Sequence, residues 1–167
     1  MKLWHESALN QLSTYFEKNE DVLGLFLFGS LSSAAIPKDY WSDIDILVVV
    51  KDHMLSKFFP AVDWIDFFGT LYTYDQSSDN YKCTTRACFE NFNRIDFVFT
   101  TEEKLARVAE WESLPFATGL KTIFSRSQNT DRIVQQRYSQ QPILAVTEKQ
   151  ARISTSKVVS GINLSHS

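Results

Sequence analysis

Two short apolar runs separated by a polar spacer constrain the fold of this chain more than any other feature. Residues 22–28 are rich in β-formers, are too short for a typical helix and end at Gly29. Residues 44–50 (IDILVVV) have the same character. The pattern predicts two buried strands, joined by a short helical turn and a loop within residues 31–42.

Further elements follow from the spacing of the apolar residues. Residues 3–17 place Leu, Trp, Tyr and Phe at helical spacing, which predicts an amphipathic helix that covers a core. Residues 53–68 predict one helix that continues into an aromatic run. Residues 84–91 and 94–100 predict two more strands, and the Asn residues between them favour a tight antiparallel turn.

The second half of the chain begins with a helix and then loses its pattern. Thr100 can cap this helix and Glu103 can reach back to it, and the helix should stop before Pro115. From about residue 125 the sequence is polar and weakly periodic. We therefore expect one α+β domain of residues 1–124, followed by a weakly specified tail of residues 125–167.

The composition is that of a globular protein of the cytoplasm. The 167 residues are 44% hydrophobic and carry a net charge of −3, without the basic patch typical of nucleic-acid binders. No signal peptide is evident and no apolar run is long enough to span a membrane. Cys83 and Cys88 lack metal-ligand spacing and predict reduced thiols. We expect neither nucleic acid nor a membrane as a partner.

Two aspartates lie side by side on the second predicted strand. Side chains alternate along a strand, so Asp43 and Asp45 share one face with Cα atoms roughly 6.5 Å apart. Neighbouring carboxylates resist ionising unless a cation lies between them. Mg²⁺ binds one or two carboxylates together with substrate phosphates. The pattern alone also fits two residues on the solvent face of an edge strand.

The Gly-Ser pair and a third aspartate strengthen the metal interpretation. Gly29 permits close backbone approach, and the turn at Ser30 can offer N–H groups and a hydroxyl to a phosphate. Asp96 lies in the apolar strand RIDFVFT, either as an exposed residue, as a partner of Arg94 or as a site residue. If its strand neighbours that of Asp43 and Asp45, three carboxylates can bind two metal ions about 3.5–4 Å apart.

The segments FGSLSSAAIPKDYWSDIDILVVVKD and CFENFNRIDFVFTTEEKL resemble the DNA polymerase β-type nucleotidyltransferase superfamily. Within it, they are most similar to the aminoglycoside 6-adenylyltransferases that modify streptomycin and confer antibiotic resistance. The resemblance spans about residues 20–110. It implies a nucleotidyltransferase fold, with a mixed sheet flanked by helices. It also implies transfer of AMP from ATP to a substrate hydroxyl, with Mg²⁺ as cofactor and pyrophosphate as product.

The same resemblance assigns roles to single residues. It implies that Gly29 and Ser30 bind the triphosphate. Asp43 and Asp45 would be the metal ligands. Asp96 would complete the catalytic site as a third metal ligand or as a helper base beside the attacking hydroxyl. The acceptor would be a cationic small molecule, and catalysis would consist of positioning and charge neutralisation.

The chain departs from the family pattern at two places. Leu31 stands where relatives commonly have an arginine. Relatives continue into a helical C-terminal domain that forms the antibiotic pocket and supplies a carboxylate base, whereas no Asp or Glu follows Glu148 here. We expect residues 125–167 to be the start of a truncated helical domain and the truncation to impair activity. A homodimer or a helical partner protein would then supply the missing part.

Two other functions stay open beside the aminoglycoside adenylyltransferase. One is a minimal nucleotidyltransferase that works as an antitoxin-like module and AMPylates or binds a partner protein. The other is a non-catalytic remnant that keeps the fold. Mg²⁺-dependent ATP binding would separate the remnant from the other two functions.

Overall fold

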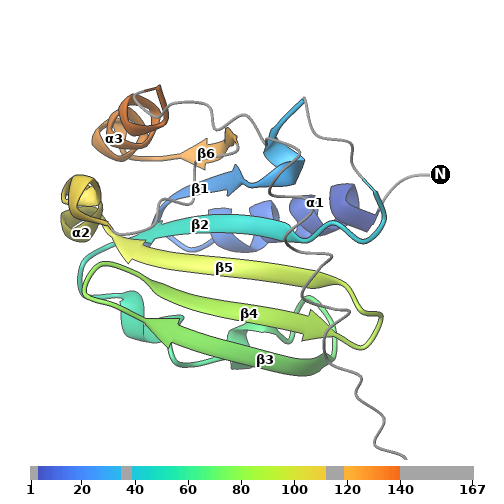
Figure 1. The fold of residues 1–167 in the computed structure, drawn as a ribbon. Coiled ribbons are helices and arrows are strands. Elements are labelled where there is room, and N and C mark those ends of the chain that lie inside the picture. Colours follow the sequence, from blue (N-terminus) through green and yellow to red (C-terminus); the bar gives the residue numbers. More distant parts are fainter. Residues whose placement is uncertain (1–3, 35–38, 112–118, 140–167) are drawn as a thin grey trace, which may run out of the picture.

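The computed structural model describes residues 4–34, 39–111 and 119–139 (Figure 1). The chain order of the elements is α1 (Trp4–Glu17), β1 (Val22–Phe28), β2 (Ile44–Val50), β3 (Leu71–Ser78), β4 (Cys83–Phe89), β5 (Arg94–Thr101), α2 (Glu102–Ala106), β6 (Leu120–Ser125) and α3 (Gln128–Ser139). Single 3₁₀ turns lie at Ser30–Ser32, Leu55–Lys57, Asp63–Ile65 and Val108–Glu110.

The strands form one mixed sheet in the order β3-β4-β5-β2-β1-β6. Strands β2 and β5 are parallel, and the other neighbouring pairs are antiparallel. The described residues therefore form a mixed sheet with helices on both faces, which confirms the predicted α+β class. No helix in the described parts of the chain combines the length and apolar character that crossing a bilayer requires.

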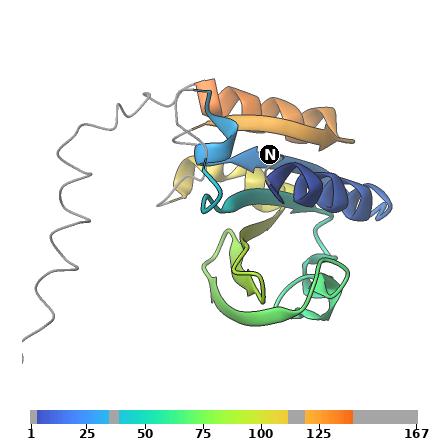
Figure 2. The ribbon, with the colours of Figure 1, turned by 90° about the vertical axis from the view of Figure 1, so that its right-hand side faces the viewer.

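One face of the sheet carries most of the core. Figure 2 shows α1 and the segment of residues 51–70 on the same side of the strands. Leu12 and Phe16 of α1 are fully buried against this face. Trp64 packs its ring edge-on against Phe97 and Phe99 of β5, with ring centroids 5.0 and 5.4 Å apart. This layer fixes β2 and β5 from behind.

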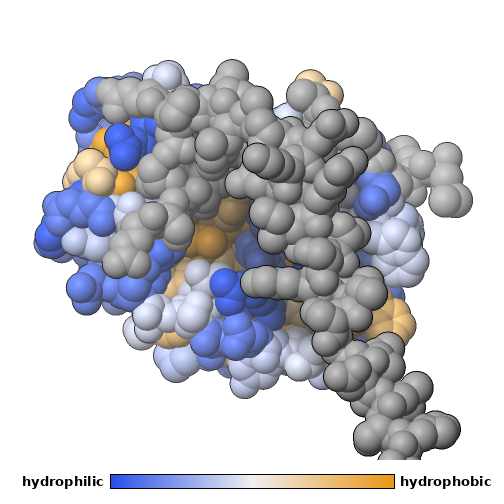
Figure 3. Space-filling view, viewed as in Figure 1, coloured by the Kyte–Doolittle hydropathy of each residue, from blue (hydrophilic) through white to orange (hydrophobic). Residues whose placement is uncertain are grey.

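The opposite face is covered at one end. Helices α2 and α3 lie where β5 ends (Figure 1) and bury Leu105 and Val134 against Leu47 and Val98 of the sheet. Figure 3 looks onto this face and shows apolar residues near its middle and mostly hydrophilic residues over β3 and β4. The end where β2 and β5 begin lies away from α2 and α3.

Several predicted elements are confirmed. Helix α1, strands β1 and β2 and the antiparallel β4–β5 hairpin all occur within a residue or two of the predicted bounds. The predicted helical turn after β1 is the 3₁₀ turn Ser30–Ser32. Residues 35–38 of the predicted loop lie outside the described residues.

Other predictions were wrong. Residues 53–68 contain two 3₁₀ turns and no α-helix. Pro60 interrupts this segment, and its aromatic side chains enter the core individually rather than along one helical stripe. The α2 cap is Thr101, whose hydroxyl accepts from the Lys104 N–H, whereas Thr100 donates its hydroxyl hydrogen to the Tyr81 carbonyl. The α-helix ends at Ala106, and Pro115 lies outside the described residues.

Three elements were missed. Strands β3 and β6 lie at the two edges of the sheet; β3 is largely exposed and β6 is half-buried. Helix α3 falls in the segment predicted as a tail, yet its Thr130 and Val134 are fully buried against the sheet and α2. Residues 140–167 lie outside the described part, so the division of the chain at residue 124 stays a prediction.

Candidate active site

The strand register brings the predicted site residues together at one end of the central strands β1, β2 and β5. Asp45 on β2 pairs with Phe28 on β1 and with Asp96 on β5. Paired residues of neighbouring strands point to the same face, so the Asp45 and Asp96 carboxylates lie side by side. Gly29 directly follows Phe28. The metal interpretation of the sequence required the strand of Asp96 to neighbour the strand of Asp45, and the structure shows that it does.

Gly29 is required at its position by a close approach. Its φ is 71° and its ψ is −159°, a conformation that is essentially confined to glycine. A Cβ atom at this residue would lie 2.8 Å from Cγ of Asp45 and 3.2 Å from Cβ of Asp45. The turn after β1 thus packs directly against the Asp45 carboxylate.

The turn that contains Ser30 is held by short local contacts. The Ser32 N–H and hydroxyl both donate to the Gly29 carbonyl, at 3.2 and 2.8 Å. A Cβ at Gly119, just before β6, would lie 3.3 Å from the Ser32 carbonyl carbon. Ser30 is half-buried between these neighbours. The Gly-Ser turn is therefore fixed beside the aspartates, as the sequence predicted.

Asp45 and Asp96 resist ionisation in this structure. Burial raises the pKa of Asp45 to about 7, and the neighbouring Asp43 and Asp96 charges add to this rise while Arg94 opposes it. Burial also raises the pKa of Asp96, with a further contribution from Asp43, against the lowering effects of Arg86 and Arg94. A cation placed between these groups would favour their charged forms.

Two arginines face the carboxylates. Arg94 and Asp43 stand next to the first paired residues of β5 and β2, and the Arg94 guanidinium donates a hydrogen bond to Asp43. Arg86 pairs with Asp96 in the β4–β5 register, and its Nε lies 3.6 Å from Oδ2 of Asp96. Arg94 was considered as a partner of Asp96, but its hydrogen bond goes to Asp43.

Sequence reasoning missed Arg86. The observed hairpin is centred on Asn91, which places Arg86 opposite Asp96. The predicted strands 84–91 and 94–100 centre the turn near residue 92 and would place Cys88 or Phe89 opposite Asp96, so the predicted hairpin alone did not identify Arg86.

The loop that leads into β2 is tied to the start of α1. The Trp4 indole N–H donates to the Tyr40 carbonyl at 2.9 Å, and Nε2 of His5 lies 2.6 Å from the Ser42 carbonyl oxygen. The Asp39 carboxylate accepts from the Trp41 N–H at 2.9 Å. These bonds position Asp43 at the end of the loop.

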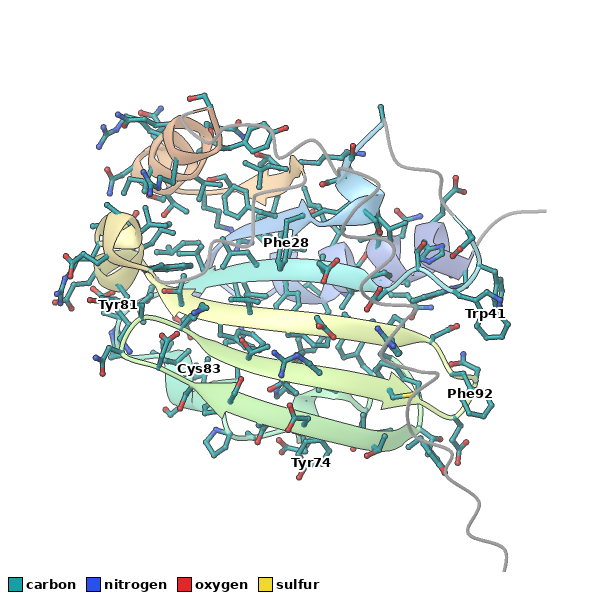
Figure 4. All side chains as sticks on the ribbon, viewed as in Figure 1. Phe28, Trp41, Tyr74, Tyr81, Cys83 and Phe92 are labelled. Carbon is teal, nitrogen blue, oxygen red and sulfur yellow. The ribbon has the colours of Figure 1, made fainter. Side chains whose placement is uncertain are left out.

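Exposed aromatic rings lie near the same end of the strands. Figure 4 shows Trp41 beyond the start of β2 and Phe92 on the turn between β4 and β5. Both side chains are largely exposed. Phe92 has a φ of 63°, which is uncommon for a residue other than glycine. The two rings mark the rim of the site.

Comparison with known proteins identifies the family of this chain. The model of the streptomycin adenylyltransferase family matches residues 4–150. The chain belongs to this family. A solved structure of an aminoglycoside 6-adenyltransferase from Bacillus subtilis is 15% identical, with a TM-score of 0.44. The match covers 60% of this chain and 36% of that one, so the chain spans about a third of that protein's length. No curated protein matches the sequence.

The site of this streptomycin adenylyltransferase family member has the donor atoms that Mg²⁺ prefers. The three aspartates supply carboxylate oxygens. Burial and the neighbouring negative charges raise the pKa of Asp45 and of Asp96, so a cation bound between them would favour their charged forms. Within residues 4–34, 39–111 and 119–139, no three acidic, His or Cys side chains are already gathered around one metal position. Arg94 and Arg86 instead contact Asp43 and Asp96. The residues fit the ion by the chemistry of their donor atoms.

Proposed function

We propose that this chain transfers AMP from ATP to a hydroxyl of an aminoglycoside such as streptomycin, with Mg²⁺ as cofactor. The observation that carries this proposal is the register of β1, β2 and β5, which sets Gly29, Asp45 and Asp96 at one end of these central strands. Membership of the streptomycin adenylyltransferase family supports the reaction type. A cytoplasmic location is part of the same proposal.

Each site residue has a role in this reaction. Gly29 and Ser30 hold the triphosphate at the turn after β1, where Gly29 lets the turn lie against Asp45 and the Ser30 hydroxyl can donate to a phosphate oxygen. Asp43 and Asp45 would hold Mg²⁺, and Asp96 would act as a third ligand or as a helper base. When bound, Mg²⁺ supplies charge neutralisation at the phosphate oxygens.

The chemical step is an in-line displacement at the α-phosphorus. A bond forms between the acceptor hydroxyl oxygen and the α-phosphorus, and the bond from that phosphorus to the pyrophosphate oxygen breaks. The hydroxyl proton leaves to a base. Asp96 is suited to take it, because burial raises the pKa of its carboxyl and makes it a stronger base than an exposed aspartate.

The proposal is tested by a transfer assay with ATP labelled on the α-phosphate. We expect Mg²⁺-dependent label on streptomycin with the native chain and a loss of about 100-fold or more in Asp45→Asn and Asp96→Asn. Asp66→Asn is the matched control, because Asp66 is exposed and lies in the segment behind the sheet. Absence of transfer together with absence of Mg²⁺-ATP binding would refute the proposal and favour the non-catalytic remnant.

A further inference from the structure

A polar hollow lies on the sheet face beside the candidate active site. It has a volume of about 240 Å³ and lies over β3, β4 and the turn between them. Its lining residues are Ser77, Ser78, Asp79, Lys82, Thr84 and Arg86. The hollow is smaller than the pockets of about 300–1,000 Å³ that enclose drug-sized ligands, so it suits one ring of a larger molecule.

Arg86 connects the hollow to the reacting centre. Its guanidinium faces Asp96 and also donates to Oδ2 of Asp75 at 2.9 Å. The exposed side-chain fraction rises from 25% at Asp96 to 50% at Arg86 and 72% at Asp75, so the face opens to solvent in this direction. A guanidinium has five N–H donors, so Arg86 retains donors for a ligand.

The order of the strands sets the direction from which an acceptor must come. In an in-line displacement, the attacking and leaving oxygens lie on opposite sides of the phosphorus. The proposed phosphate turn follows β1, on one side of the β2 aspartates, while β5 and β4 lie on the other side. With pyrophosphate leaving toward Gly29 and Ser30, the acceptor hydroxyl approaches over Asp96 and Arg86.

We propose that this hollow is the acceptor subsite, and that Arg86 is a specificity-determining residue that donates hydrogen bonds to the acceptor beside the attacked hydroxyl. This inference rests on the proposed function. The lining offers hydroxyls from Ser77 and Thr84, and its two cations are already compensated, Lys82 by Asp79 and Arg86 by Asp75 and Asp96. It therefore takes a hydroxyl-bearing ring of the acceptor.

Two other roles for Arg86 lead to different kinetics. If Arg86 bound the triphosphate, its removal would raise the KM for ATP. If it only neutralised Asp96, its removal would lower kcat and leave both KM values unchanged. An acceptor-binding role raises the KM for the acceptor alone.

The test is steady-state transfer to streptomycin by the full chain and by Arg86→Ala, Arg86→Lys and Thr84→Val. We expect Arg86→Ala to raise the KM for streptomycin about tenfold or more, as the loss of hydrogen bonds from a charged donor predicts. Arg86→Lys should recover part of this loss, and Thr84→Val should show a smaller rise. The KM for ATP should stay within about twofold of the native value in all three. Arg132→Ala is the matched control, because Arg132 is exposed on α3 and its guanidinium donates to Asn129 of the same helix.

A binding measurement keeps this inference separable from the proposed function. Streptomycin is titrated calorimetrically into each protein with Mg²⁺ and a non-hydrolysable ATP analogue, and melting curves confirm that each variant is folded. Tight binding by the native chain that weakens in Arg86→Ala supports the subsite. Binding that is unchanged in Arg86→Ala, or a higher KM for ATP, overturns the subsite alone. No streptomycin binding by the native chain overturns the subsite and the proposed acceptor together.

Discussion

Replacing Gly29 by alanine tests the link between the Gly-Ser turn and Asp45. The backbone at Gly29, with φ 71° and ψ −159°, costs about 1–3 kcal/mol for a residue with a side chain. The new Cβ would also lie 2.8 Å from Cγ of Asp45, so the carboxylate must move. Overpacking of this kind adds a similar amount, and we expect a total loss of about 2–6 kcal/mol.

The assay is thermal unfolding with and without Mg²⁺-ATP. At about 2–4 °C per kcal/mol for a chain of this size, Gly29→Ala should lower the Tm by roughly 4–24 °C. A ligand at about 100 times its Kd stabilises a folded protein by about 2.7 kcal/mol, which gives a clear upward shift for the native chain. We expect this shift to disappear in Gly29→Ala, because the displaced Asp45 no longer supports the site.

Gly69→Ala separates backbone strain from damage to the site. Gly69 also has a positive φ, 152°, but a Cβ there would meet only Cδ1 of Phe89 at an ordinary 3.8 Å. This variant should lose stability through its backbone alone and keep the full Mg²⁺-ATP shift. The reasoning fails if Gly29→Ala unfolds within about 0.5 kcal/mol of the native chain or keeps the ligand shift.

Two further predictions concern stability. The folded pKa of Asp45 is about 7, above its ordinary value of 3.8, so the folded state holds a proton that the unfolded chain releases. The metal-free protein should therefore lose stability as the pH rises from about 4 to 7. Urea unfolding from about pH 4 to 8 measures this loss, and Asp45→Asn should show a flatter stability profile and higher stability at pH 8. Parallel profiles for the native chain and the variant would contradict this. Thr101→Ala should lower the free energy of unfolding by about 1 kcal/mol in the same measurement, because it removes the α2 cap. Thr101→Ser keeps the hydroxyl and should retain most of that stability. Equal losses in the two variants would show that the hydroxyl does not cap the helix.

The central strands and the main site residues were predictable because their signals are local. Residues 22–28 and 44–50 are apolar enough to specify buried strands without knowledge of their partners. The alternation of side chains then places Asp43 and Asp45 on one face, and Gly29 marks the end of the first strand. These features depend only on residues within one element and its immediate neighbours.

The edge strands and the 53–68 segment were not predictable in this way. Strand β3, LYTYDQSS, is mostly exposed and polar, so its strand conformation depends on pairing with β4. Strand β6 depends in the same way on β1. In residues 53–68 the contacts of Phe58 and Trp64 with Phe99 favour irregular backbone over the helix that composition suggested.

The sequence by itself determined the chemical character of this protein: a Gly-Ser turn and aspartates on strands, in the order typical of adenylyltransferases. Only the tertiary structure decided which of these groups meet. The parallel pairing of β2 with β5 set Asp96 beside Asp45, and the β4 register added Arg86. The pairing of β2 with β5 joins residues some fifty positions apart, so it depends on packing of the whole core and cannot be read from local pattern.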